Sequence, residues 1–124
     1  MLSPQEVNCL RACSECAAAC LQCVTDCAKG GHTETLSRCM ALARECADLC
    51  REAITSIALG SVHIDTVCAQ CAQACQRCAA ECAKHDFEYC QQCAQMCLRC
   101  AAECQGMARA AFTKPGYSLA SVTA

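Results

Sequence analysis

Six cysteines between Cys9 and Cys27, in the stretch CLRACSECAAACLQCVTDC, follow one another at steps of four, three, four, three and four residues. Steps of three and four residues bring side chains to one face of an α-helix. The stretch therefore predicts a helix whose buried face carries sulfur where leucine is usual. A chain that repeats this pattern must bury one face of each long helix, which favours a helical bundle.

The pattern returns twice in the second half of the chain. The segments CAQCAQACQRCAAEC (68–82) and CQQCAQMCLRCAAEC (90–104) share the spacing CxxCxxxCxxCxxxC and the ending CAAEC. Both place cysteine at consecutive a and d positions of a heptad, which form the inward seam of a bundle. A further tract is poorer in sulfur, and its a/d frame runs through Cys39, Ala43, Cys46, Cys50, Ala53 and Ile57. Every cysteine is thus expected to face one shared interior.

Capping and glycine signals divide the chain into four helices. Ser3-Pro4-Gln5-Glu6 is a capping box that opens a helix running to about Lys29, where Gly30-Gly31 ends it. Further helices are expected over about 33–59, 62–84 and 87–112, the third capped by Ser61 and the fourth by Asp86. Short connections between long helices require antiparallel neighbours. The predicted fold is all-α, an up-down-up-down four-helix bundle over residues 1–112, followed by a loose C-terminal tail over 113–124.

Composition excludes several classes of function. The formal net charge of -2 gives no basic footprint for nucleic acid or for a membrane surface, and no apolar run is long enough to span a membrane. The start MLSPQEVNC has no basic region, apolar region or cleavage site of a signal peptide, so we expect a cytosolic protein with reduced thiols. An odd number of cysteines, 19, also argues against a disulfide framework.

So many inward thiols indicate that soft metal ions are bound by thiolate. Leu, Ile, Val and Phe make up only about 15% of the chain, below the roughly 20% at which ordinary apolar cores become doubtful. Sulfurs three or four residues apart on a helix can approach the distance that a two-coordinate metal spans, and Cu(I) accepts two thiolates readily. One monovalent cation per thiolate leaves the interior neutral, whereas zinc in four-thiolate sites would bury excess negative charge. We therefore expect Cu(I) at about one ion per cysteine.

Two alternatives to copper storage stay open. A zinc or cadmium thiolate buffer would use the same cysteines at a lower loading. A redox-responsive helical interaction module would form reversible disulfides and bind few metals. Iron–sulfur binding is disfavoured because the spacing is strictly helical and no proline follows a cysteine. No general base, nucleophile elbow or nucleotide loop is visible, so we expect no enzyme.

The two ends of the expected bundle differ in character. At the end that holds the N-terminus, the frame positions are Ile57, Ile64 and Met107, which predicts an apolar plug. The other end carries His32, His85 and Asp86, and we expect metal to enter there. His63, Met40 and Met96 lie beside the frame, where a solvated or packing role is favoured over metal binding.

The combination of ECADLC (45–50), CAxCAxxCxxCxxEC (68–82), KHD (84–86) and CxxCAxxCxxCAxEC (90–104) resembles the bacterial cytosolic copper storage proteins that lack an export signal. The resemblance covers about Val7 to Met107. It implies a bundle filled by many Cu(I) ions, a homotetramer and no catalysis. Copper donor or acceptor proteins are candidate partners. It also implies that His85 and Asp86 lie at the mouth. The implied copper ligands are Cys9, Cys13, Cys16, Cys20, Cys23, Cys27, Cys39, Cys46, Cys50, Cys68, Cys71, Cys75, Cys78, Cys82, Cys90, Cys93, Cys97, Cys100 and Cys104.

Overall fold

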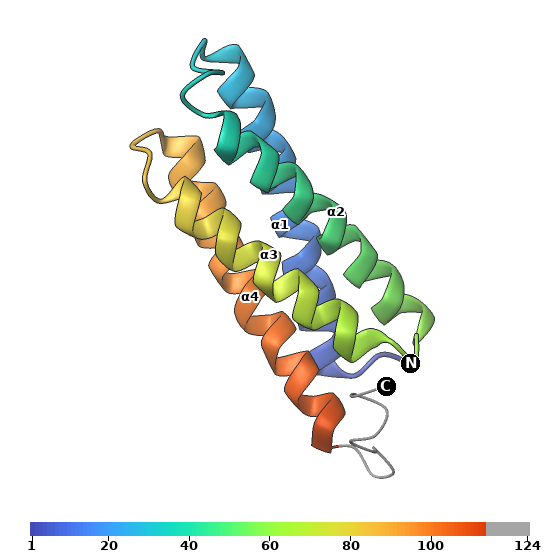
Figure 1. Ribbon diagram of the computed structural model, residues 1–124. Helices are drawn as coiled ribbons and strands as arrows, with labels where there is room; N and C mark the ends of the chain where they lie inside the picture. The colour runs from blue at the N-terminus through green and yellow to red at the C-terminus, as the bar shows by residue number, and fades with distance from the viewer. Residues whose placement is uncertain (114–124) are drawn as a thin grey trace.

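The computed structural model describes residues 1–113, and the side chains of residues 1–110. The elements in order are α1 (Pro4–Lys29), α2 (Ser37–Leu59), α3 (Ile64–Cys82) and α4 (Glu88–Thr113). Each helix packs against two neighbours, in the ring order α1, α2, α3, α4 (Figure 1). The predicted all-α four-helix bundle is confirmed. Of the predicted tail, Thr113 is the last residue of α4, and residues 114–124 lie outside the described residues.

Local signals at the start of α1 act as the sequence predicts. The Ser3 hydroxyl accepts a hydrogen bond from the Glu6 amide at 3.1 Å, and the Glu6 carboxylate accepts one from the Ser3 amide at 2.8 Å. Pro4 occupies the first turn, where its missing amide proton would have no helical partner in any case. This reciprocal cap satisfies two backbone donors and fixes where α1 begins.

The starts of α2, α3 and α4 differ from the predictions. α2 begins at Ser37 rather than near 33, and α3 spans Ile64–Cys82 rather than 62–84. Ser61 accepts a hydrogen bond from the His63 amide, but it lies outside α3, which has no side-chain cap. Asp86 is not the N-cap of α4, because that helix begins at Glu88.

Apolar residues account for two of these shifted starts. Leu36 directly precedes α2 and is fully buried, and Phe87 directly precedes α4 and packs against the core. The Phe87 carbonyl accepts the hydrogen bonds from the Cys90 and Gln91 amides that open α4. α2 and α4 therefore each begin after an apolar side chain that packs against the bundle, rather than at a polar cap.

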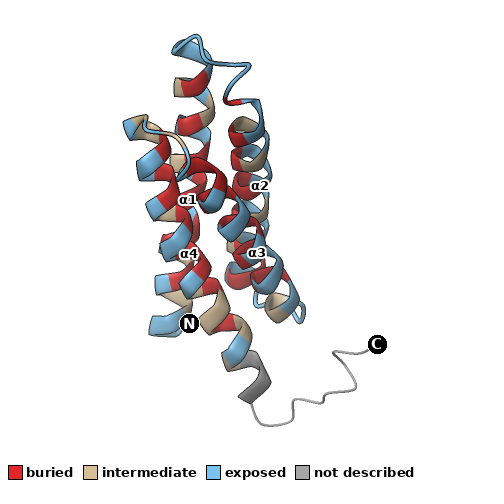
Figure 2. Ribbon diagram, turned by 60° about the vertical axis from the view of Figure 1, so that its left-hand side comes forward, coloured by how far each residue is buried: buried red, intermediate tan, exposed pale blue. Residues whose placement is uncertain are grey.

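The core consists of cysteine and alanine from all four inward faces (Figure 2). Leu36 and Ile57 are the largest fully buried side chains, and they lie at the two ends of α2. Among the described residues, no helix combines the length and the apolar character needed to cross a membrane.

Candidate metal centre

All 19 cysteine side chains are buried, with at most 1% of any of them exposed. All of them are free thiols. The prediction that every cysteine faces one interior is therefore confirmed. The heptad frame produces this result, because each cysteine occupies an inward a or d position of its helix.

Sulfur atoms from all four helices meet in the middle of the bundle. The Cys16 Sγ on α1 lies 3.8 Å from that of Cys46 on α2, 4.0 Å from that of Cys75 on α3 and 3.7 Å from that of Cys97 on α4. The Cys46 Sγ lies 3.5 Å from that of Cys75 and 3.9 Å from that of Cys97. We call these four residues the central layer. Opposite helices thus meet through sulfur across the axis of the bundle.

The sulfur contacts continue from the central layer toward both ends. Toward the N-terminal end, the contacts at 3.6–3.9 Å join Cys9, Cys13, Cys50, Cys71, Cys100 and Cys104. Toward the histidine-bearing end, contacts at 3.2–4.0 Å join Cys20, Cys39, Cys78, Cys82 and Cys93. The shortest, 3.2 Å, is between Cys39 and Cys82. The interior is one column of sulfur rather than a set of separate sites.

Within a single helix, the closest thiol pairs have a spacing of four residues. The described same-helix pairs at 4.0 Å or less are Cys16–Cys20, Cys23–Cys27, Cys78–Cys82 and Cys100–Cys104. A step of four residues turns a side chain by about 40° around the helix, whereas a step of three turns it by about 60° the other way. CxxxC pairs therefore stack along the axis, and most other close contacts join different helices.

Several groups of four thiols have the size of a metal-binding unit. In each group, all sulfur atoms lie within 4.8 Å of one another, as in Cys13–Cys71–Cys100–Cys104 and Cys23–Cys27–Cys39–Cys90. A linear unit with two metal–sulfur bonds of about 2.3 Å spans about 4.6 Å. The thiols are thus close enough to ligate metal with small side-chain movements. Neighbouring groups share members, since Cys16 and Cys46 belong to two of them, so metals bound there would share sulfurs.

Burial governs the protonation of two thiols near the histidine-bearing end, Cys27 and Cys90. It raises the pKa of the Cys27 thiol, and it raises that of Cys90 to about 12. Removing a thiolate from water disfavours its charge, so both groups are protonated at neutral pH in the metal-free protein. A metal ion that binds them must displace their protons.

A buried carboxylate organises the histidine-bearing end. The Glu81 side chain, 10% exposed, accepts hydrogen bonds from Arg38 of α2 at 3.2 Å and from Lys84 at 3.3 Å. Its second oxygen lies 3.0 Å from Nε2 of His85, whose side chain is 16% exposed. The hydrogen bond with His85 lowers the pKa of Glu81 against the opposing effect of burial, and Lys84 adds to the lowering. Glu81 therefore holds the His85 ring in place, while the His85 amide donates to the Cys82 carbonyl at 3.1 Å.

Aromatic rings also cover this end. The rings of His32 and Phe87 lie 4.8 Å apart, and those of Phe87 and Tyr89 are stacked at 5.4 Å. The Tyr89 hydroxyl reaches the end of α1, since a Cβ added to Gly30 would lie 3.2 Å from it. Cys27, Cys39 and Cys90 beneath are fully buried. Asp86 is exposed to solvent and His32 is on the surface, so of the three predicted polar residues only His85 is half-buried.

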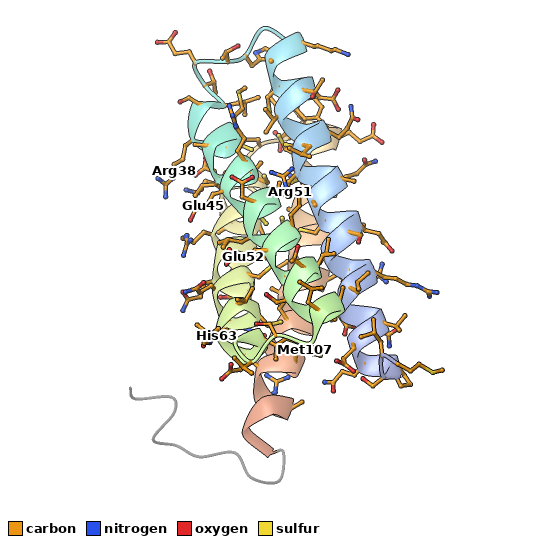
Figure 3. All side chains as sticks on the ribbon, turned by 90° about the vertical axis from the view of Figure 1, so that its right-hand side faces the viewer. Arg38, Glu45, Arg51, Glu52, His63 and Met107 are labelled. Atoms are coloured by element: carbon orange, nitrogen blue, oxygen red, sulfur yellow. The ribbon has the colours of Figure 1, made fainter. Side chains whose placement is uncertain are left out.

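The opposite end has the predicted apolar plug. Ile57 and Met107 are buried, and Ile64 packs against the core. Figure 3 shows Met107 of α4 at this end of the bundle, and exposed His63 lies at the same end.

Sequence reasoning missed Glu81, Leu36, Phe87 and Tyr89. One feature of the sequence pointed to Glu81, namely its position directly before an inward cysteine in CAAEC. The pattern could not show that Arg38 of α2 would pair with it. Leu36 and the two aromatic residues lie outside the cysteine frame. Their hydrophobic character next to a helix start was the available signal.

The fold and the sulfur column define a class of protein, the helical bundles that bind soft metal ions through thiolates. The model of the copper storage protein family, Csp, matches residues 3–109, and the chain belongs to this family.

Solved structures of related proteins share the fold. The apo form of copper storage protein 3 from Bacillus subtilis is 42% identical, with a TM-score of 0.75, and the match covers 82% of this chain and 96% of that one. The Cu(I)-bound copper storage protein BsCsp3 is 40% identical with a TM-score of 0.81, covering 84% and 98% of the two chains. A cytosolic copper storage protein from Streptomyces lividans, solved with five coppers, is 28% identical with a TM-score of 0.82, covering 85% and 92%.

Proposed function

We propose that this chain stores and sequesters Cu(I) on its inward thiolates, at about one ion per cysteine. The observation that carries the proposal is the column of 19 buried, free thiols with neighbouring sulfurs at 3.2–4.0 Å. Cu(I) neutralises one thiolate per ion, so the interior stays uncharged as it fills. Related proteins that carry Cu(I) and share the bundle support the choice of metal.

Anaerobic titration of the reduced protein with Cu(I), against a chelator of known affinity, tests the proposal. We expect tight binding to continue to about 19 ions per chain, with circular dichroism showing that the helices persist. Because bound thiolates replace thiols, uptake should release close to one proton per ion at pH 7. Saturation at two or three ions would contradict the storage function.

A zinc or cadmium thiolate buffer is the second candidate. The groups of four mutually close thiols favour it, because structural zinc takes four ligands in a tetrahedron. Titration with Zn²⁺ under the same conditions separates the two functions. Copper storage predicts only a few zinc ions, displaced by Cu(I), whereas a buffer would keep zinc in competition with Cu(I).

All 19 cysteines are proposed as ligands, with His85 and Asp86 at the mouth. The His85 amide donates to the Cys82 carbonyl, and the His85 ring is held by Glu81, which supports its place in the path of the ion. Asp86 is exposed one residue further on and suits a first contact with an arriving cation. Because Phe87 and Tyr89 cover the thiols there, we propose that these rings move when copper enters.

The proposed setting follows from the family. We place the protein in the cytoplasm, in line with the cytosolic relative from Streptomyces lividans, and we propose a homotetramer that exchanges copper with donor and acceptor proteins. It has no catalytic role in this proposal, and it binds neither nucleic acid nor membrane. The redox-responsive module stays a less favoured alternative, which reversible disulfide formation without metal uptake would support.

A further inference from the structure

The two oxygens of the Glu81 carboxylate have different kinds of partner. Oε1 contacts cationic donors, Nε of Arg38 at 3.2 Å and Nζ of Lys84 at 3.3 Å. Oε2 lies 3.0 Å from Nε2 of His85. Two cations beside one carboxylate keep it ionised, and an ionised carboxylate can only accept hydrogen bonds. The proton in the contact between Glu81 and His85 is therefore carried by Nε2 of the histidine ring.

This contact selects the nitrogen of His85 that is available to a metal ion. A neutral imidazole carries one proton, and its other nitrogen has a free lone pair. Because Nε2 donates to Glu81, the free lone pair of the neutral ring is on Nδ1, which has no hydrogen-bond partner among the described residues. The His85 side chain is 16% exposed, so part of it remains open to solvent at this end of the bundle.

Glu81 differs from the carboxylates that join helices elsewhere on the bundle. Glu15 and Glu45 each contact one arginine of a neighbouring helix, at 3.0 Å and 2.9 Å, and their side chains are 44% and 49% exposed. The Glu81 side chain is only 10% exposed, and a histidine occupies its second oxygen. Burying a carboxylate costs desolvation energy that an exposed ion pair avoids. A join between α2 and α3 therefore accounts for neither the burial of Glu81 nor its contact with His85.

We propose that Nδ1 of His85 is the atom that receives copper at the mouth, and that Glu81 is the positioning residue that leaves this atom free. The inference rests on the proposed function, in which His85 lies on the path of the ion, and it adds the binding atom and the residue that selects it. A histidine that binds a metal ordinarily donates its other ring N–H to a carboxylate, a carbonyl or water, which fixes the ring and makes the binding nitrogen more basic. Arg38 and Lys84 in turn hold the carboxylate through its other oxygen.

Glu81→Gln tests this selection, because an amide has the shape of a carboxylate but two chemically different ends. Arg38 and Lys84 are donors, so the amide oxygen should stay with them and the NH₂ group should face Nε2 of the ring. Nε2 must then accept a hydrogen bond, and the ring proton moves to Nδ1. Glu45→Gln is the matched control, because it makes the same change in an ion pair that joins α2 and α3. Arg38 and Glu45 project from the same side of α2 (Figure 3).

Nitrogen-15 NMR of the reduced, metal-free full chain shows which ring nitrogen carries the proton. The spectra are recorded at about pH 8.5, where an imidazole is ordinarily neutral. The chain has three histidines, and the signals that His85→Gln removes are those of His85. We expect the proton on Nε2 in the unchanged protein and in Glu45→Gln, and on Nδ1 in Glu81→Gln. A proton on Nδ1 in the unchanged protein, or a ring that Glu81→Gln leaves unchanged, would overturn the role of Glu81.

Copper transfer then tests Nδ1 as the binding atom. Stopped-flow transfer of Cu(I) from a coloured chelator complex measures how fast the first ions are taken up. Loss of the group that orients a metal-binding histidine typically costs about 10–100-fold in affinity or activity, so we expect the first ions to enter Glu81→Gln at least about tenfold more slowly. Glu45→Gln should match the unchanged protein. A ring proton that moves to Nδ1 without slowing transfer, or slow transfer with the proton still on Nε2, would overturn the assignment.

Copper capacity separates this inference from the storage function. These substitutions leave all 19 thiols in place, so each variant should finally bind as many Cu(I) ions per chain as the unchanged protein. Circular dichroism confirms that each variant is folded. A folded protein that binds only a few ions in every form would contradict storage. The position of the ring proton is measured without copper, so that result would leave the role of Glu81 to be judged from the NMR spectra alone.

Discussion

Replacement of Cys16 by leucine should divide copper uptake into two stages. Cys16 contacts sulfurs of the other three helices in the central layer, so a leucine there puts a branched apolar side chain on the axis of the column. An ion that moves from thiolate to thiolate finds no ligand on α1 at this level. If copper enters at the histidine-bearing end, thiols beyond the layer become hard to reach.

The structure sets the size of each stage. Eight thiols lie between the layer and the histidine-bearing end, namely Cys20, Cys23, Cys27, Cys39, Cys78, Cys82, Cys90 and Cys93. Seven lie beyond it, namely Cys9, Cys13, Cys50, Cys68, Cys71, Cys100 and Cys104. At about one ion per thiol, we expect rapid uptake of about eight ions in Cys16→Leu, with the rest binding at least about tenfold more slowly, since even 1.4 kcal/mol of added barrier slows a step tenfold.

Stopped-flow transfer of Cu(I) from a coloured chelator complex, under anaerobic conditions, measures both stages. Cys9→Leu is the matched control, because it makes the same substitution next to the apolar plug, where Cys9 contacts Cys104. That variant should keep rapid uptake of about 18 ions. Overpacking by leucine costs about 1–3 kcal/mol, so denaturant unfolding of both apo variants checks that they remain folded.

Full rapid uptake by Cys16→Leu would refute an axial path. If Cys9→Leu lost the rapid stage, and Cys16→Leu filled the thiols at the N-terminal end first, copper would enter the bundle at the N-terminal end. In either case His85 and Asp86 would lose their proposed role at the mouth.

Three further predictions concern the metal-free bundle. Glu81→Gln should lower the free energy of unfolding by about 1 kcal/mol at pH 7, because it weakens the ion pairs with Arg38 and Lys84, which are largely solvent-exposed. The folded pKa of Glu81 is lowered from 4.5, so the stabilisation is present above pH 4.5 and is lost as the pH falls through the folded pKa. The free energies of unfolding of the two proteins, measured by chemical denaturation, should therefore converge in acid. Gly60→Ala should lower the free energy of unfolding by about 1 kcal/mol, because Gly60 ends α2 with a φ of 64°, in the left-handed region. Gly106→Ala, inside α4, should raise the free energy of unfolding by a similar amount. Tyr89→Phe removes a buried hydroxyl that has no hydrogen-bond partner among the described residues. The thermal midpoint of the variant should therefore equal or exceed that of the unchanged protein. A lower midpoint would show that the hydroxyl stabilises the fold.

The sequence was sufficient to predict the bundle and its sulfur lining, because both follow from a spacing that repeats along the chain. α1 was predicted closely, since the capping box of Ser3 and Glu6 is a local signal and Gly30 ends the helix. The starts of α2 and α4 were not, because Leu36 and Phe87 fold onto the core through contacts that a local pattern does not contain.

The histidine-bearing end was predicted only in part for the same reason. His85 was identified from its place in the chain, but its partner Glu81 belongs to α3 and is itself held by Arg38, 43 residues earlier. A pattern shows which residues share a helix face, and it does not show which faces meet. The ring contacts of Phe87 with His32 likewise join residues far apart in the sequence.

Linear coordination of a metal by two sulfurs requires sulfur atoms along the whole column to move apart, because the inter-helix contacts of 3.2–4.0 Å are shorter than such a unit. The sulfurs of the central layer lie 3.5–4.0 Å apart, whereas a linear unit with metal–sulfur bonds of about 2.3 Å needs about 4.6 Å. Because the contacts of this layer join different helices, the extra distance separates helices instead of straining one of them. Leu36 and Ile57 fill the two ends of α2 with large apolar side chains, which hold the helices together before any metal binds. Between Leu36 and Ile57 the interior is lined by cysteine and alanine, which leave space for copper. The largest fully buried apolar side chains therefore lie at the two ends, outside the part of the core where copper binds.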